Sequence, residues 1–274
     1  WSPLEWIHLV SGKSYKEIYK ASFAYSDTVS DVFRDQSVKP VVENTYSLPA
    51  DSINLSDTRQ VEYYSKNKYV RCALEYISKR RLDTAVNRAR TYYISLNDVV
   101  HRNRLIIPFF DTDNKILFYQ SRALTPDAEN VSRYLSKSNA AMSLYGVDKI
   151  DIDLPYIFLF EGPIDSMFVR NGVGVGGLHL KEYQKTQLTK YFCHEQIWIL
   201  DNQLDNEQVL NQYYALIETG QRVFVWPEAL KEYKDLNDVC VSTQTDDVSY
   251  TLFTNHSYTG DTAIRQIERA LLTT

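Results

Sequence analysis

The chain has 274 residues, of which 44% are hydrophobic and 24% charged, so disordered and collagen-like classes are excluded. No apolar run reaches the roughly 18 residues of a membrane-spanning helix. The three cysteines lie far apart, which excludes a disulfide framework and a CxxC zinc site. We expect one large domain or two small ones in a reducing, cytoplasmic setting. Because the chain starts at Trp1 and not at Met, we expect it to be a fragment.

The charge is unevenly distributed along the chain. The net charge of −5 argues against a general polyanion binder. Residues 66–104, however, contain ten lysines and arginines against three acids, a net +7, which leaves −12 for the rest of the chain. Such a basic block is typical of a nucleic-acid footprint, and equally of a solvated helix face.

The first 57 residues predict short helices and a linker. Residues 2–5 and 14–17 have the spacing of helix capping boxes. Residues 26–57 are rich in Ser, Asp, Asn and Pro and show weak periodicity, as linkers do. We interpret residues 1–57 as a helical remnant followed by a linker.

Residues 58–150 predict a basic subdomain of mixed helices and strands. Residues 58–90 place apolar side chains at helical spacing. Apolar runs at 105–110 and 116–119, separated by a polar turn, predict a β-hairpin.

The second half alternates short apolar runs with helical stretches. Strands are expected at 156–160, 172–175, 197–200 and 222–226. Helices are expected at 164–170, 181–192 and 206–219. This alternation indicates βαβ units and a buried parallel sheet over residues 151–240, followed by a C-terminal helical segment, 241–274. The predicted fold class is therefore α/β, with an α+β subdomain preceding a parallel sheet flanked by helices.

Acidic residues follow three of the expected strands. They are Glu161 and Asp165, then Asp201 and Asp205, then, after a loop, Asp235 and Asp238. Because the carboxyl ends of parallel strands meet at one edge, we expect these acids to gather in a hard-oxygen site for Mg²⁺ or Mn²⁺. Taken singly, an acid after a strand is equally explained as a helix N-cap.

Three glycines have the spacing of a dinucleotide-binding loop. Gly172, Gly174 and Gly177 fit G-x-G-x-x-G, but a helix and not a strand is expected before them. We interpret them as relief of crowding where a strand passes close to neighbouring backbone.

The acidic motifs resemble a known domain. EGPID at 161–165, LDN at 200–202 and KDLND at 234–238 resemble the three signature elements of the TOPRIM domain, which DnaG-type primases, topoisomerases and some nucleases share. Upstream segments resemble the region that precedes TOPRIM in DnaG-type primases: RLIIP at 104–108, DN at 113–114, SRAL at 121–124 and LYGV at 144–147. In the order of the motifs and in the residues they contain, the chain is most similar to the replicative primases of T-even-type tailed phages.

This resemblance implies a DNA primase domain that makes short RNA primers from NTPs on a single-stranded DNA template, by Mg²⁺- or Mn²⁺-dependent nucleotidyl transfer. It also implies a zinc-binding domain before Trp1, a replicative hexameric helicase as partner, and, for a phage protein, the host cytoplasm. No membrane partner is expected. Two other functions remain open: a non-catalytic TOPRIM module that binds template or helicase, and a TOPRIM nuclease.

The resemblance also suggests roles for individual residues. The expected catalytic residues are Glu161 and Asp165, and the expected metal ligands are Asp201, Asp205, Asp235 and Asp238. The expected nucleotide or template contacts are Arg80, Arg81, Arg104, Arg122, Lys137 and Lys234. The chain departs from the family at Gln203, where relatives carry a second acid, and at residues 140–143, where bacterial members carry a lysine.

Overall fold

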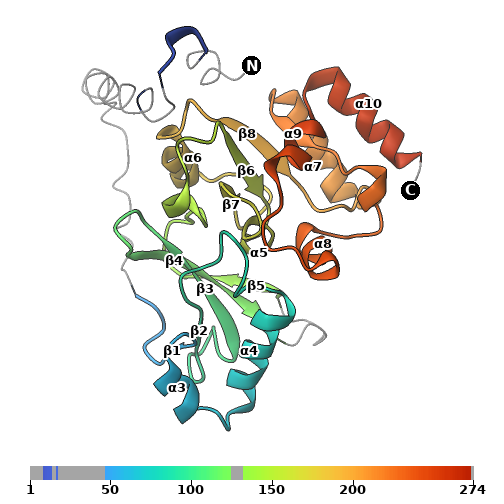
Figure 1. Cartoon of the computed structure of the whole chain (residues 1–274). Coiled ribbons are helices and arrows are strands. Elements are labelled where there is room, and N and C mark those ends of the chain that lie inside the picture. Colours follow the sequence, from blue (N-terminus) through green and yellow to red (C-terminus); the bar gives the residue numbers. More distant parts are fainter. Residues whose placement is uncertain (1–8, 14–16, 18–46, 125–131, 273–274) are drawn as a thin grey trace.

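The structure, a computed structural model, describes residues 9–13, 17, 47–124 and 132–272. It contains two five-stranded sheets with helices packed around them (Figure 1). The two capping boxes predicted near the start of the chain fall outside the described residues, apart from Glu17. No helix in the described parts has the length and hydrophobicity needed to cross a membrane.

The first sheet is antiparallel, with its strands in chain order. Its strands are β1 (Ile53–Asn54), β2 (Tyr93–Ile94), β3 (Arg104–Phe110), β4 (Ile116–Ala123) and β5 (Tyr134–Ser136). The β3–β4 pair confirms the predicted hairpin. Strand β1 belongs to this sheet although it lies in the stretch interpreted as a linker.

Helices α3 (Thr58–Tyr63) and α4 (Lys68–Lys79) lie between β1 and β2 in the chain. Helix α4 begins at the Asn67 cap, whose side-chain oxygen accepts from the backbone N–H groups of the first turn. It buries Val70, Ala73 and Ile77 at helical spacing. The predicted helical stretch ends earlier than expected, because Arg81 adopts a left-handed backbone conformation (φ 57°) and turns follow it.

A register shift in the β3–β4 hairpin decides which side chains share a face. Arg104 pairs with Ala123 and Phe109 with Phe118, but a bulge between Phe109 and Phe110 shifts the register by one residue. Because side chains alternate along a strand, Gln120 and Arg122 lie on one face and Ser121 on the other.

The second sheet has the strand order β10-β9-β8-β6-β7. Its strands are β6 (Tyr156–Phe160), β7 (Gly172–Gly174), β8 (Glu195–Ile199), β9 (Arg222–Phe224) and β10 (Ser257–Tyr258). The pairs β6–β7, β6–β8 and β8–β9 are parallel, which confirms the predicted parallel sheet. The antiparallel edge strand β10 comes from the C-terminal segment, which was expected to be helical throughout.

Helices cover both faces of this sheet. On the face toward the first sheet lie α5 (Pro163–Ser166), α8 (Leu236–Thr243) and α9 (Tyr250–Asn255). On the other face lie α6 (Glu182–Thr189), α7 (Glu207–Glu218) and α10 (Gly260–Leu271). Two 3₁₀ turns, η1 (Val147–Lys149) and η2 (Glu228–Leu230), complete the elements. Strand β6 is buried on both faces, with Phe158 and Phe160 in one cluster and Ile157 and Leu159 in the other.

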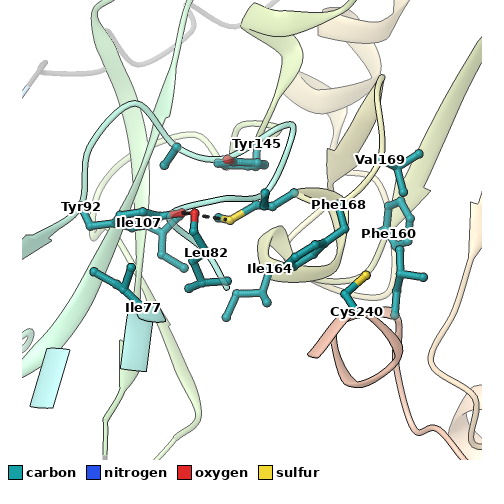
Figure 2. Close-up of a cluster of buried hydrophobic side chains, with 14 of the residues drawn as sticks. Ile77, Leu82, Tyr92, Ile107, Tyr145, Phe160, Ile164, Phe168, Val169 and Cys240 are labelled. Carbon is teal, nitrogen blue, oxygen red and sulfur yellow. Dashed lines mark hydrogen bonds between the residues drawn. The ribbon is translucent and has the colours of Figure 1, made fainter. Parts of the chain in front are cut away.

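One hydrophobic core joins the two sheets (Figure 2). Ile107 of β3 and Phe160 of β6 both belong to it. At its centre the hydroxyl of Tyr92 donates to the carbonyl of Leu82 (2.9 Å) and lies 3.2 Å from the sulfur of Met167. Because one continuous core packs between the two sheets, it fixes the position of their facing edges relative to each other.

The three glycines with the spacing of a dinucleotide-binding loop, Gly172, Gly174 and Gly177, differ in how closely other atoms surround them. A Cβ on Gly172 would lie 2.2 Å from the Ser166 carbonyl oxygen, and one on Gly174 would lie 2.7 Å from Pro163 Cα. Crowding is therefore confirmed for these two. For Gly177 that interpretation is wrong, because a Cβ there would meet no atom within 4 Å. All three cysteines are free, as expected from their spacing.

Candidate functional site

A cleft of about 400 Å³ lies between the two sheets. The second sheet and its helices provide the acids Glu161, Asp165, Asp201, Asp235 and Asp238, together with Lys234. The first sheet and the segment after α4 provide the cations Arg80, Arg122 and Arg133, together with Gln120 and Tyr134. The acids therefore all come from the second half of the chain, whereas the arginines come from the first.

Each acid is placed by the end of an element. Glu161 directly follows β6, and Asp201 lies two residues after β8, so the two parallel strands bring them to one edge. Asp165 lies in the short helix α5. Asp235 is the N-cap of α8, and its side chain accepts from the backbone N–H of Asp238 (2.8 Å). The N-cap explanation is therefore true of Asp235, although this residue also lines the cleft.

Two asparagines fix the loops that carry these acids. The Asn202 side chain donates to the carbonyl of Tyr233 (2.8 Å), and its backbone N–H donates to the carbonyl of Lys234 (2.8 Å). This holds the segment before Asp235 against the end of β8. The backbone N–H of Asn237 donates to Asp165 (2.9 Å), which links α8 to α5.

A third asparagine joins the two halves behind the cleft. The Asn87 side chain donates to the carbonyls of Ser166 (3.0 Å) and Gly172 (2.7 Å). The backbone carbonyl of Asn87 accepts from the Tyr145 hydroxyl (2.8 Å) and the Lys149 ammonium (2.6 Å). This buried joint fixes α5, and with it Asp165, relative to the first sheet.

The carboxyl groups of the cleft are buried close to one another, which disfavours their ionised forms. Burial, together with the nearby carboxylates of Glu161 and Asp235, raises the pKa of Asp201 to about 7. Burial and the same kind of repulsion raise the pKa of Asp165 well above its usual value, and burial raises the pKa of Glu161. Such a group of acids gains stability from any cation that enters the cleft.

Arginines meet these acids from the opposite wall. The Arg80 guanidinium lies 3.1 Å from the Asp238 carboxylate. The Arg122 guanidinium lies over the ring of Tyr134, 4.7 Å from its centroid, and its Nε has no hydrogen-bond partner among the described residues. Arg133 is exposed beside them. Arg122 and Arg133 are thus placed to receive an anion.

Arg104 and Lys137, both expected to bind nucleotide or template, lie on the other face of the first sheet. The Arg104 guanidinium donates to Ser121 Oγ (3.0 Å) and to the carbonyls of Ser132 (2.8 Å) and Arg133 (3.1 Å). Lys137 is buried, with its ammonium 6.0 Å from the centroid of the Tyr119 ring. Both face away from the cleft because strand alternation puts them on the side of Ser121.

Arg81 and Asp205 also lie outside the cleft. Arg81 donates to both carboxylate oxygens of Asp246 (2.9 and 2.8 Å), which ties the turn after α4 to the segment after α8. Asp205 is exposed in the turn before α7, and the N-cap of that helix is Asn206. Gln203, the departure from the family pattern, does not line the cleft either.

Sequence reasoning missed Gln120, Arg133 and Tyr134. The first lies two residues before Arg122, so strand alternation alone would have placed it on the same face. The other two belong to β5 and the residue before it, a strand that no periodicity indicated.

The donor chemistry of the cleft suits a divalent cation. Carboxylate oxygens are the preferred ligands of Mg²⁺ and Mn²⁺, and these carboxylates repel one another without a cation. Among the described residues, however, no three carboxylate, histidine or cysteine side chains are close enough together to form a preassembled metal site.

The comparisons with known proteins give one informative match in sequence. The chain is 31% identical over 137 residues to the DNA primase of Enterobacteria phage T4, which covers 50% of this chain and 38% of that protein. The resemblance to phage-type primases is thereby confirmed, although the chain spans well under half the length of this relative. No family model matches the chain.

The comparison with solved structures also finds primase domains, at low sequence identity. The RNA polymerase domain of Mycobacterium tuberculosis primase DnaG has a TM-score of 0.48 and 16% identity, covering 77% of this chain and 70% of that one. A DNA primase domain from Pseudomonas aeruginosa has a TM-score of 0.44 and 18% identity, covering 67% and 59%.

Proposed function

We propose that this chain is the RNA-polymerase domain of a phage-type DNA primase, which joins ribonucleotides into short primers on single-stranded DNA. The observation that carries the proposal is the cleft in which acids from the strand ends of one sheet face arginines from the other. The match to the T4 primase supports the same reading. A triphosphate with its divalent cation needs both kinds of group within one site.

The acids would hold Mg²⁺ or Mn²⁺. Asp201 and Asp235 are the proposed ligands, with Asp238 released from Arg80 as a further one. When bound, the cation would neutralise charge on the triphosphate and polarise the α-phosphate for attack. We leave Asp205 out of the proposed ligands, because it is exposed and lies outside the cleft.

The chain's own residues would then perform the transfer. Arg122, Arg133 and Lys234 bind the triphosphate and orient it. Glu161 accepts the proton of the attacking 3′-hydroxyl, a role helped by the raised pKa that burial gives this carboxyl. Asp165, fixed by the N–H of Asn237, keeps the loops in register. The new phosphodiester bond forms at the α-phosphorus as pyrophosphate leaves.

The basic block would hold the template. Lys68, Arg102 and Tyr69 line a second hollow of about 380 Å³ near α4. A polyanion held there would be released by salt, because binding liberates condensed counterions. A helicase partner, an upstream zinc domain and the host cytoplasm remain predictions from the resemblance.

One assay distinguishes this function from the two alternatives. The chain is incubated with single-stranded DNA, the four NTPs and Mg²⁺ or Mn²⁺, and the nucleic acids are separated by length. New RNA is the expected result. Cut DNA would instead identify a nuclease, and neither product would indicate a binding module.

A further inference from the structure

The buried amide of Gln120 lines the cleft with one polar atom unused. Gln120 lies in the middle of β4 and is 3% exposed. It belongs to the wall of the cleft, on the same face of the strand as Arg122. Its side-chain oxygen, Oε1, has no hydrogen-bond partner among the described residues. Buried polar atoms without partners are few in native proteins, so this one needs an explanation.

The orientation of the amide is fixed by its nitrogen. Nε2 donates to the hydroxyl oxygen of Ser136 (3.2 Å) and to the carbonyl of Gly176 (3.3 Å). Because a carbonyl only accepts, the nitrogen must be the atom beside Gly176, which leaves the oxygen as the unpaired atom. Gly176 has φ 76°, and a Cβ there would lie 2.8 Å from Nε2. The loop therefore has room for this amide only because residue 176 is glycine.

The loop that receives the amide is attached to the catalytic edge. The backbone N–H groups of Gly176 and Gly177 donate to the carbonyl of Glu161 (2.8 and 3.1 Å). Gln120 thus bridges the first sheet to the loop beside the proposed general base. Gln120 lines the same wall of the cleft as Arg122, and the acids of the second sheet line the cleft as well.

We propose that Gln120 Oε1 accepts a hydrogen bond from the 2′-hydroxyl of the incoming nucleotide, so that Gln120 selects ribonucleotides. This inference rests on the proposed function. Two residues along a strand span about 6.8 Å. With the phosphates held at Arg122, the sugar is the next group along the nucleotide, and the base lies beyond it. The 2′-hydroxyl is a donor that all four ribonucleotides carry and their 2′-deoxy forms lack, so an acceptor for it would select ribonucleotides whatever their base.

Equilibrium binding to the full chain tests the proposal with ATP, 2′-deoxyATP, UTP and inorganic tripolyphosphate, each with Mg²⁺. The wild type should bind ATP more tightly than 2′-deoxyATP. Gln120→Met, which keeps the length but removes the acceptor, should reduce that preference by roughly tenfold, the scale of one hydrogen bond. It should weaken ATP and UTP alike and leave tripolyphosphate binding unchanged. Ser136→Ala, which keeps Oε1, should retain the preference.

The outcomes separate this inference from the function on which it rests. An unchanged ratio of ATP to 2′-deoxyATP affinity in Gln120→Met would overturn the inference alone. So would a loss for ATP but not for UTP, because uracil lacks an exocyclic amino group and the base would then be the donor. A wild type that binds neither ATP nor tripolyphosphate would overturn both. Should Gln120→Met fail to fold, Gln120→Asn withdraws the oxygen by one methylene and is expected to reduce the same preference.

Discussion

The two walls of the cleft are built in different ways. The acidic wall takes its carboxylates from the ends of β6 and β8 and from the starts of α5 and α8, so its charges converge because parallel strands end together. The basic wall is one face of an antiparallel pair, β4 with β5, whose two faces carry different groups. On the cleft face, Nε of Arg122 has no hydrogen-bond partner among the described residues, whereas Arg104 on the far face donates to Ser121 Oγ and to the carbonyls of Ser132 and Arg133. Position on a face therefore separates the arginines that line the cleft from the arginine that is bonded into the fold.

The largest effect is expected from the acidic wall. Glu161→Gln keeps the shape of the side chain and removes its charge, and burial already disfavours that charge in the folded chain. The variant should therefore fold as well as the wild type while primer synthesis falls at least about a hundredfold, the scale of a lost acid or base group. A folded variant with near-normal primer yield would remove Glu161 from the mechanism.

The two faces of the basic wall should respond oppositely. Arg104→Ala removes the hydrogen bonds that a buried guanidinium makes to Ser121 and Ser132, and should lower the free energy of unfolding by roughly 3 kcal/mol. Arg122→Ala should change unfolding far less and should weaken binding of tripolyphosphate with Mg²⁺ by about tenfold, the scale of one charged hydrogen bond. Denaturant unfolding and equilibrium binding measure the two quantities. Equal stability losses in both variants would refute the distinction between the faces.

The acidic wall should also give the fold a characteristic pH dependence. Because the pKa of Asp201 is about 7 in the folded chain, the folded state holds a proton that the unfolded state has released above its ordinary pKa near 3.8. The free energy of unfolding should therefore fall as pH rises from about 4 to 7, and level off above 7. Asp201→Asn should flatten this slope in metal-free buffer. An unchanged slope would mean that Asp201 ionises normally.

The smallest effect is expected at Gln203, where the chain departs from the motif of the primases that it resembles. Gln203 lies outside the cleft, so Gln203→Asp should change the Mg²⁺ concentration needed for half-maximal primer synthesis by less than about twofold. A Mg²⁺ titration of the variant beside the wild type measures this. A clear fall in the required Mg²⁺ would show that position 203 reaches the metal.

Five of the six expected acids line the cleft but only three of the six expected cations do, for a physical reason. Strand ends of a parallel sheet converge whatever their register, so EGPID and KDLND sufficed to place their acids. If the register of the Phe110–Ile116 pair continued along the whole hairpin, Arg104 would lie directly opposite Arg122, on the same face. The bulge after Phe109 moves Arg122 opposite Leu105 and onto the other face. No pattern of residues in the sequence indicates that bulge.

The central claim, that nucleotidyl transfer takes place where the two walls meet, is tested most directly by a pair of identical substitutions four residues apart. Asp201→Asn removes a charge inside the cleft, and Asp205→Asn removes one from an exposed turn outside it. Template-directed RNA synthesis is measured for both, across a Mg²⁺ titration, after each is shown to fold. We predict a loss of at least about a hundredfold for Asp201→Asn and near-normal synthesis for Asp205→Asn. Equal activity in the two variants, or a larger loss in Asp205→Asn, would contradict the account.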